Sequence, residues 1–385
     1  MTSRGAEWRG PKRAPRNWPA IVMFAVTTAA AFTIFPWYAV TYGFAPVTWL
    51  VFVLFMLATG MSITGGYHRL WSHRAYAAHP IVEWFYLLFG AMALQNSVFC
   101  WAAQHRFHHR FIDDVDNDPY AIGRGFWFAH IGWMLRDYPG ARVGDFSNIE
   151  DLQRNPRLRF QHRHYLAIAL GMNVAAPLLA GWLVGDVWGC LLLAGLLRLV
   201  LNHHFTFFIN SLAHLWGRRP YTRDNTARDN DLVALITYGE GYHNFHHQFQ
   251  WDYRNGVRWW QFDPTKWLIA SLSWVRLTYG LKRVPEFRIQ RAMLARQFER
   301  LQQSIEQRRR QGRLVALTAL IEQERVMFAA TLGEFRQLQA ERFDAVRRQL
   351  ADQWRGSEVR ERLQALEKAL RAQRRRVRLL RLQVA

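Results

Sequence analysis

The chain has 385 residues and a mass of 45.3 kDa, and half of its residues are hydrophobic, among them 18 Trp and 26 Phe. This aromatic content excludes a disordered chain. The formal net charge of +21 comes from 50 Lys and Arg against 29 Asp and Glu, and two cysteines are too few for a disulfide framework. The mean hydropathy of −0.16 averages over two unlike parts, an apolar body and a charged tail.

The body is predicted to begin with a hairpin of two membrane-spanning helices. Residues 17–67 contain no Asp, Glu, Lys or Arg, and a bilayer core needs about 20 apolar residues per helix. This stretch is long enough for spans at Trp18–Tyr38 and Val47–Tyr67, joined at Gly43–Pro46. The basic segment 1–16 is followed by no small-residue cleavage site, so we expect a retained membrane anchor.

A second hairpin is predicted at Tyr165–Gly185 and Val187–Leu215. Between the hairpins, Ile81–Ala103 is also apolar, and its length alone allows it either to span the bilayer or to lie at the interface. Basic residues flank the outer ends of both hairpins, and neither hairpin turn carries one. Since basic loops stay in the cytoplasm, this pattern predicts four spans, both termini cytoplasmic, and Ile81–Ala103 not crossing.

The tail is predicted to be helical and basic. From Lys282 onward there are 25 Lys and Arg against 12 Asp and Glu, with no proline after Pro285, a composition that favours long helices. Apolar residues recur there at helical spacing, with breaks expected at three glycines: Leu314, Leu317, Leu320, Ile321, Leu363, Leu366 and Leu370, and Gly312, Gly333 and Gly356. We interpret the tail as a solvated amphipathic extension or coiled coil, or as a surface for anionic lipid or a partner.

Three domains are therefore predicted: a basic N-terminal segment at 1–16, a body at 17–281 that contains the four spans and the segments between them, and the basic helical or coiled-coil tail at 282–385.

Histidine clusters give the strongest chemical signal. They are His68–His73 (HRLWSH), His105–His109 (HRFHH) and His243–His247 (HNFHH). Because positions i, i+3 and i+4 share one face of a helix, each HxxHH is predicted to point three imidazoles at one spot. Imidazole suits iron, zinc and copper. Eight clustered histidines exceed the four ligands of one structural zinc, so two metals are predicted, and a zinc hydrolase is an alternative on spacing alone.

The remaining histidines carry a weaker signal. His203, His204 and Arg198 lie inside the predicted fourth span, where polar groups are functional candidates by default. No cluster contains these two histidines, and we interpret them as making structural polar contacts. The others are predicted to lie at the interface or on the surface: His79, His130, His162 and His164.

The clusters resemble the three histidine boxes of the membrane-bound stearoyl-CoA, or delta-9, fatty-acid desaturase family, the third box reading GEGYHNFHH at Gly239–His247. Three further segments are similar to that family: Gly125–Leu135 (GFWFAHIGWML), Asn210–His214 (NSLAH) and Asn225–Asn230 (NTARDN). The resemblance extends from the first span to about Tyr279 and does not include the tail.

The resemblance implies an all-α membrane fold in which four transmembrane helices, in two hairpins, are capped by a cytosolic helical domain holding a non-haem di-iron site. The charged C-terminal helical extension is additional. The same resemblance implies that the protein is an O2-dependent fatty acyl desaturase, an enzyme that introduces a cis double bond near the middle of a saturated chain. The implied metal ligands are His68, His73, His105, His108, His109, Asn210 (through water), His214, His243, His246 and His247.

The same resemblance implies a kinked internal acyl tunnel. Gln95, Asn96 and Trp101 fall where the family has the lining of this tunnel, and Arg124 matches a basic residue near the headgroup of the acyl carrier. Acyl-CoA is the favoured substrate. However, Ala103–Gln104 replaces an Arg-Asp pair that helps to hold coenzyme A in animal relatives, so acyl-lipid and acyl-carrier-protein substrates remain alternatives.

Partners and location follow from the same resemblance. No fused cytochrome b5 signature is present, so we expect a separate electron donor such as a ferredoxin with its reductase, docked on a basic face. We expect membrane lipid but no nucleic acid as a partner, and a bacterial inner membrane with the active site cytoplasmic. The alternative functions are a di-iron fatty-acid or alkane hydroxylase, and a non-catalytic membrane scaffold with a partner-binding tail.

Overall fold

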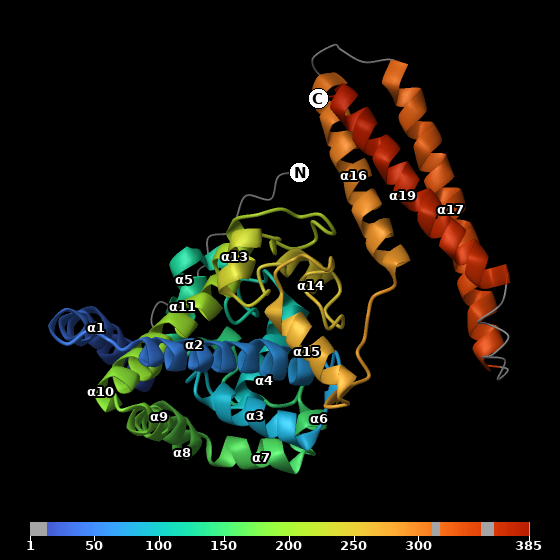
Figure 1. The fold of residues 1–385 in the computed structure, drawn as a ribbon. Coiled ribbons are helices and arrows are strands. Elements are labelled where there is room, and N and C mark those ends of the chain that lie inside the picture. The colour runs from blue at the N-terminus through green and yellow to red at the C-terminus, as the bar shows by residue number, and fades with distance from the viewer. Residues whose placement is uncertain (1–13, 310–315, 348–357, 385) are drawn as a thin grey trace. The chain divides into compact units, whose positions relative to one another are not determined.

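The computed structural model describes residues 14–309, 316–347 and 358–384 (Figure 1). The described chain divides into two compact units. The first, the membrane body, comprises the chain up to Arg219 together with Asp224–Arg283, and the second, the tail, comprises Pro220–Arg223 and the chain from Val284 onward. Residues 1–13 of the predicted basic N-terminal segment lie outside the described residues.

Four helices of the body are long and apolar enough to cross a membrane, in agreement with the four predicted spans. The first is α1 (Trp18–Thr41), and the second joins α2 (Pro46–Met61) to the π-helix η1 (Ser62–Ser72). The third runs through α8 (Tyr165–Leu170), η5 (Gly171–Ala175) and α9 (Ala176–Val184). The fourth runs through α10 (Val187–Cys190), η6 (Leu191–Leu197), α11 (Arg198–Asn210) and α12 (Leu212–Leu215).

The apolar segment between the two hairpins does not form a single long helix. It is divided into α3 (Pro80–Ala91) and α4 (Val98–Phe111), and Ser97 caps the start of α4. In the turn between them, Leu94 and Asn96 have φ values of 50° and 72°, in the left-handed region that no helix continues through. The 12 residues of α3 are too few to cross a bilayer, which agrees with the prediction that this segment does not cross.

Short helices complete the body around this segment: η2 (Ile122–Arg124), α5 (Phe126–His130), η3 (Gly132–Met134), η4 (Pro139–Ala141), α6 (Glu150–Gln153), α7 (Pro156–Arg163), α13 (Asp231–Ile236), α14 (His243–Gln248) and α15 (Pro264–Trp274). Strand β1 (Ala77–Ala78) pairs antiparallel with β2 (Thr278–Tyr279). The largest core cluster of the body gathers buried side chains of η1, α3, α4 and α15, including Tyr67, Tyr86 and Ile269. This core fixes the end of the second span against α4 and α15.

The tail contains three long helices, α16 (Glu286–Arg309), α17 (Ala316–Arg347) and α19 (Glu358–Val384), and α19 packs against both of the others. Its own hydrophobic core consists of Phe287, Leu294, Phe298, Leu301, Ile321, Leu370 and Val377. Gly333 lies inside α17, so the helix break predicted there is wrong. Leu314, Gly312 and Gly356 lie outside the described residues.

Polar groups of the fourth span hold the end of α3. The buried Arg198 donates hydrogen bonds to the Met92 carbonyl (2.7 Å) and to Asn173 Oδ1 (2.6 Å), and His203 Nε2 lies 2.8 Å from the Ala93 carbonyl. These are structural contacts, as the sequence interpretation expects, and they satisfy carbonyls that the helix end leaves without a partner. His130 is only 3% exposed, so the surface position predicted for it is wrong. Its Nε2 atom lies 3.0 Å from Nδ1 of His204.

We expect Arg198→Met to lower the free energy of unfolding by about 3 kcal/mol, because it leaves the buried Met92 carbonyl without its charged donor. Thermal unfolding of the detergent-solubilised protein measures the change. Arg159→Met is the control, since Arg159 is an exposed arginine of α7. An unchanged midpoint for Arg198→Met would contradict a structural role for this residue.

Candidate metal centre

Nine histidines converge in the body as two adjacent groups. The five-histidine group consists of His68, His73, His105, His109 and His246, and the four-histidine group of His108, His214, His243 and His247. Within each group, one ring nitrogen from every member lies within 4.8 Å of those of the other members. The rings of His109 and His247 stack at 4.2 Å between centroids and so join the two groups.

The first histidine pair is brought together by a π-helix. Positions i and i+5 diverge on an α-helix, but a π-helix forms its hydrogen bonds from i to i+5. The His73 amide donates to the His68 carbonyl at 3.1 Å, at the end of η1. The two imidazole centroids lie 4.7 Å apart as a result. This backbone form explains how the HxxxxH spacing supplies two ligands to one group.

Each HxxHH segment divides its imidazoles between the two groups, whereas the helical spacing alone predicts that all three point at one spot. On α4, His105 and His109 belong to the five-histidine group and His108 to the four-histidine group. On α14 the division is the reverse, because His243 and His247 join the four-histidine group and His246 the other. In both helices the histidines at positions i and i+4 belong to the same group, and the histidine at position i+3 belongs to the other group.

The spacing of the ring nitrogens fits a metal ion at the centre of each group. The Nε2–Nε2 distances are 2.7 Å for His73–His105 and 3.0 Å for His109–His246 in one group, and 3.0 Å for His243–His247 in the other. Imidazole binds a divalent metal at about 2.1 Å, which places neighbouring ligand nitrogens about 3.0–3.4 Å apart. The distances between ring nitrogens in the two groups are therefore close to those expected around a bound metal ion.

Burial favours the neutral form of six imidazoles in the two groups. The pKa of every one of the following residues is lowered well below its usual value, first by burial and then by neighbouring histidines: His73, His105, His109, His243, His246 and His247. A neutral imidazole carries one lone pair, and that lone pair is what a metal binds.

Acceptors outside the two groups orient three of the rings. His68 Nδ1 lies 2.9 Å from Glu240 Oε2, and His108 Nδ1 lies 2.8 Å from Asp118 Oδ1. His214 Nδ1 lies 2.8 Å from the Thr226 hydroxyl, which itself donates to a carboxylate. An Nδ1–H that donates outward leaves the Nε2 lone pair pointing inward. Inward-facing lone pairs about 3 Å apart repel each other unless a cation lies between them.

Glu240 is itself held as a carboxylate. Arg69, which is fully buried, donates to Glu240 Oε1 from Nη2 at 2.8 Å, and Asn255 donates to Oε2 at 2.6 Å. Burial would raise the pKa of Glu240, but His68 and Arg69 outweigh it and lower the pKa to about 2. Arg69 also donates to Asp263. The first and third histidine boxes are thereby tied together through one buried ion network.

A cavity of about 450 Å³ reaches both histidine groups. Its wall includes His68 and His105 of the five-histidine group and His108 and His243 of the four-histidine group. Apolar side chains of α1 and α11, such as Phe24 and Phe207, form another part of the wall. The cavity has the size of a small-molecule site and is mostly apolar, with a few polar groups.

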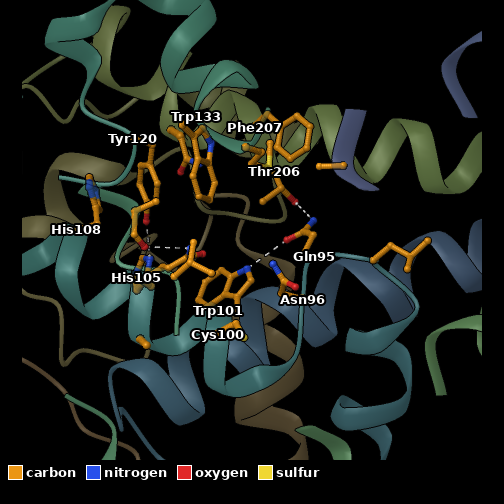
Figure 2. Close-up of a pocket in the computed structure, with 18 of the residues that line it drawn as sticks. Gln95, Asn96, Cys100, Trp101, His105, His108, Tyr120, Trp133, Thr206 and Phe207 are labelled. Carbon is orange, nitrogen blue, oxygen red and sulfur yellow. Dashed lines mark hydrogen bonds between the residues drawn. The ribbon is translucent and has the colours of Figure 1, made fainter. Parts of the chain in front are cut away.

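A short chain of polar contacts crosses this apolar wall (Figure 2). The Trp101 ring nitrogen donates to Gln95 Oε1 at 3.2 Å, and Gln95 Nε2 donates to the Thr206 hydroxyl at 2.9 Å. The ring of Trp101 stacks on His105 at 4.9 Å between centroids. The wall of the cavity is therefore connected directly to a residue of the five-histidine group.

The structure places most of the sequence-predicted site residues together. Asn210, Gln95, Asn96 and Trp101 all line the cavity, together with four of the nine histidines. Arg124 is not among the described residues that line it, and its guanidinium lies 3.6 Å from the centroid of the Phe128 ring.

Sequence reasoning missed several residues of the site. Thr206, Arg136 and Arg142 line the cavity, and Asp118 and Glu240 orient metal-facing rings. Glu240 lies inside the quoted third box and Thr206 lies eight residues before His214, so their positions carried some signal. The two arginines belong to a segment without regular spacing, and no pattern in the sequence marks them.

Comparison with known proteins agrees with this geometry. The sequence model of the fatty acid desaturase family matches residues 45–273. A probable acyl-CoA desaturase of Schizosaccharomyces pombe is 46% identical over 64% of this chain and 51% of its own length. Acyl-CoA desaturase 1 of Saccharomyces cerevisiae is 41% identical over 69% of this chain and 52% of its own length. Stearoyl-CoA desaturase 5 of Bos taurus is 37% identical over 62% of this chain and 72% of its own length.

The chain belongs to the fatty acid desaturase family, and the resemblance seen in the histidine boxes is confirmed. With its four apolar helices it is an integral membrane protein. The alignments span about half the length of the two yeast relatives. These relatives are eukaryotic, and the bacterial membrane expected from the sequence stays a prediction.

We expect Glu240→Gln to weaken metal binding by about 10–100-fold, because the amide no longer holds the His68 ring as a carboxylate does. Metal content is measured by mass spectrometry during titration with a chelator. The matched control is Glu83→Gln, which removes a partly buried carboxylate paired with Arg157. If Glu240→Gln kept its metal as tightly as this control, the orienting role would be refuted.

Proposed function

We propose that this protein is an O2-dependent fatty acyl desaturase that introduces a cis double bond of the delta-9 type into a saturated acyl chain, using two iron ions held by the nine histidines. The convergence of nine histidine rings into two adjacent groups, both of which contribute rings to the wall of one mostly apolar cavity, is the observation that carries the proposal. Family membership supports it, and the names of the yeast and cattle relatives describe the same reaction class.

The residues fit such a pair of ions. The five-histidine group would hold one and the four-histidine group the other. Asn210, on the cavity wall, would reach one of the ions through a bound water. When bound, the irons supply the oxidising power needed to remove hydrogen from an unactivated CH2 group, which amino-acid side chains lack. Two hydrogens, with their two electrons, leave the chain and O2 is reduced to two molecules of water. A separate donor supplies the other two electrons, and the solvent supplies the other two protons.

The protein's own residues bind and orient the chain. The apolar wall takes up the hydrocarbon and excludes water from the centre. The polar contacts of Trp101, Gln95 and Thr206 fix the shape of the wall beside His105, and so determine which carbons of the chain reach the metal-binding groups. This positioning selects the site of the double bond, and a delta-11 relative at 35% identity shows that the family contains more than one position.

Acyl-CoA is the substrate that we propose. Arg136 and Arg142 lie in the cavity wall, where a phosphate-bearing headgroup would meet positive charge. Two parts of the sequence prediction are retained in this proposal: the basic loops and both termini face the cytoplasm, and a separate acidic redox protein such as a ferredoxin delivers electrons. The high net charge of +21 favours the approach of an acidic donor.

The direct test is expression in a host that lacks its own desaturase, with the lipid fatty acids analysed by mass spectrometry. We expect a new monounsaturated acid, and we expect His109→Ala or His246→Ala to abolish it, because each removes one nitrogen of the five-histidine group. The control is His164→Ala, since His164 is exposed and belongs to neither group. A hydroxylated product would assign the protein to the hydroxylases instead.

A second prediction concerns the position of the double bond. Thr206→Val removes the acceptor of the Gln95 side chain, while Thr206→Ser keeps it. We expect the valine variant to lower kcat/KM about tenfold, equivalent to one hydrogen bond, and to give a mixture of double-bond positions. The serine variant should keep both the rate and the position. Iron content serves as the check that the centre is intact, and wild-type regiochemistry in Thr206→Val would disprove the role of this contact.

A further inference from the structure

The last helix of the tail carries a concentrated positive charge. The segment Lys368–Arg381 contains seven Lys and Arg and no Asp or Glu. It lies outside residues 45–273, which match the family. The desaturase chemistry does not use this segment, and its charge calls for a separate explanation.

The charges of α19 form a stripe along its exposed side. Lys368, Arg371, Arg375 and Arg378 are three or four residues apart, which places them on one face of a helix, and all four are exposed. The opposite face of α19 buries Leu370 and Val377 in the core of the tail. The stripe therefore points away from the core, and its residues are not needed to pack the three helices.

Much of this charge has no acidic neighbour. Arg376 pairs with Glu324, and Arg371 lies 3.9 Å from Glu286 and from Glu367. Among the residues that the structure describes, no ion pair is recorded for four others: Lys368, Arg375, Arg378 and Arg381. Such a stripe attracts an anionic surface.

Two large apolar side chains stand within the same stripe. Leu379 and Leu382 are 60% and 65% exposed, and they lie one helical turn from Arg375 and Arg378. Exposed leucines between arginines are the pattern of a helix that lies in a membrane interface, with its apolar side chains below the headgroups. A purely electrostatic partner would not require them.

The tail also begins close to the membrane-spanning part of the chain. The Lys282 amide donates to the Ala75 carbonyl at 2.9 Å, and β2 pairs with β1, which starts five residues after Ser72, the last residue of the second span. The first residue of α16 is Glu286, so only a few residues separate this fixed point from the tail. The tail is therefore joined by a short segment to a part of the chain that the bilayer holds, and this covalent link raises its effective concentration at that membrane.

We propose that the exposed face of α19, formed by Lys368, Arg371, Arg375, Arg378, Leu379 and Leu382, docks on the anionic headgroups of the membrane in which the body is embedded. The arginines bind lipid phosphates and the two leucines enter the interface. This proposal does not depend on the desaturase reaction, and it assigns the tail to the bilayer rather than to an acidic redox protein.

The test uses the full-length protein in nanodiscs of phosphatidylcholine alone or with roughly 30% phosphatidylglycerol. The reporter is Ala372→Cys, at an exposed position of α19 that leaves the stripe intact. Its reaction with maleimide is followed on the tail peptide by mass spectrometry, which separates it from Cys100 and Cys190. We expect the reaction to be about tenfold slower in the anionic discs, whereas Ala330→Cys on α17 should react equally in both.

Charge and apolar contributions are separated by variants. Arg375→Gln with Arg378→Gln should weaken docking about 30-fold and restore the neutral-disc rate, because each arginine near an anionic surface contributes about a fivefold factor. Arg288→Gln with Arg291→Gln, an equal charge change at exposed positions of α16, should leave the protection unchanged. Leu379→Ser with Leu382→Ser should also reduce protection, although the net charge is unaltered.

Two outcomes would overturn the proposal. One is an equal reaction rate of Ala372→Cys in both kinds of disc. The other is protection in neutral discs that appears only when an acidic ferredoxin is added and that survives Leu379→Ser with Leu382→Ser, since this would assign the face to a protein partner. The helix content of each variant, measured by circular dichroism, shows whether the tail remains folded.

Discussion

Inward-facing imidazole lone pairs are the constraint around which the rest of the body is arranged. Nδ1 of His108 faces Asp118 outward at 2.8 Å, and Nδ1 of His68 lies 2.9 Å from Glu240 Oε2. The Nε2 atoms of the same two rings face other imidazoles at 3.3 and 3.0 Å. Where both facing nitrogens carry lone pairs, the arrangement without a cation combines the cost of desolvation with mutual repulsion. Outer hydrogen bonds must therefore hold the rings in place before any metal is bound, and the buried acceptors Glu240 and Asp118 provide this preorganisation.

The second membrane-spanning helix also carries the first of these rings, and the second ring follows directly after its last residue. The second span runs from α2 into η1 without interruption and ends at Ser72, with His68 in its last turns. Arg69, next to His68, is buried in ion pairs with Glu240 and Asp263. A displacement of this span would move both a ligand and the ion network that orients it. The geometry of the metal-binding residues therefore depends on how this span packs in the membrane.

Features that depend on neighbouring residues could be predicted from the sequence, whereas contacts between segments far apart in the chain could not. A charge-free run marks the first hairpin, and histidine spacing marks the boxes, because both signals lie in neighbouring residues. The π-helical turn that pairs His68 with His73 has no such signal. The assignment of His108 to one group and His109 to the other depends on where α14 lies, which only the folded chain defines. Arg142 joins the cavity wall for the same reason. Arg124 lies over the rings of Phe128 and Tyr138, and its place near the headgroup stays a prediction.

The polar side chains of the cavity wall are compatible with a bound acyl chain because they form hydrogen bonds with one another. A hydrocarbon offers no hydrogen bonds, so a polar group facing it would lose its partners on substrate binding. Trp101 donates to Gln95, and Gln95 donates to Thr206, so that these groups have protein partners whether the cavity contains water or an acyl chain. Their positions are thus independent of the occupant. In the proposed function, a wall of this kind shapes the chain without hydrogen bonding to it, and so selects a carbon position along a substrate whose CH2 groups are chemically alike.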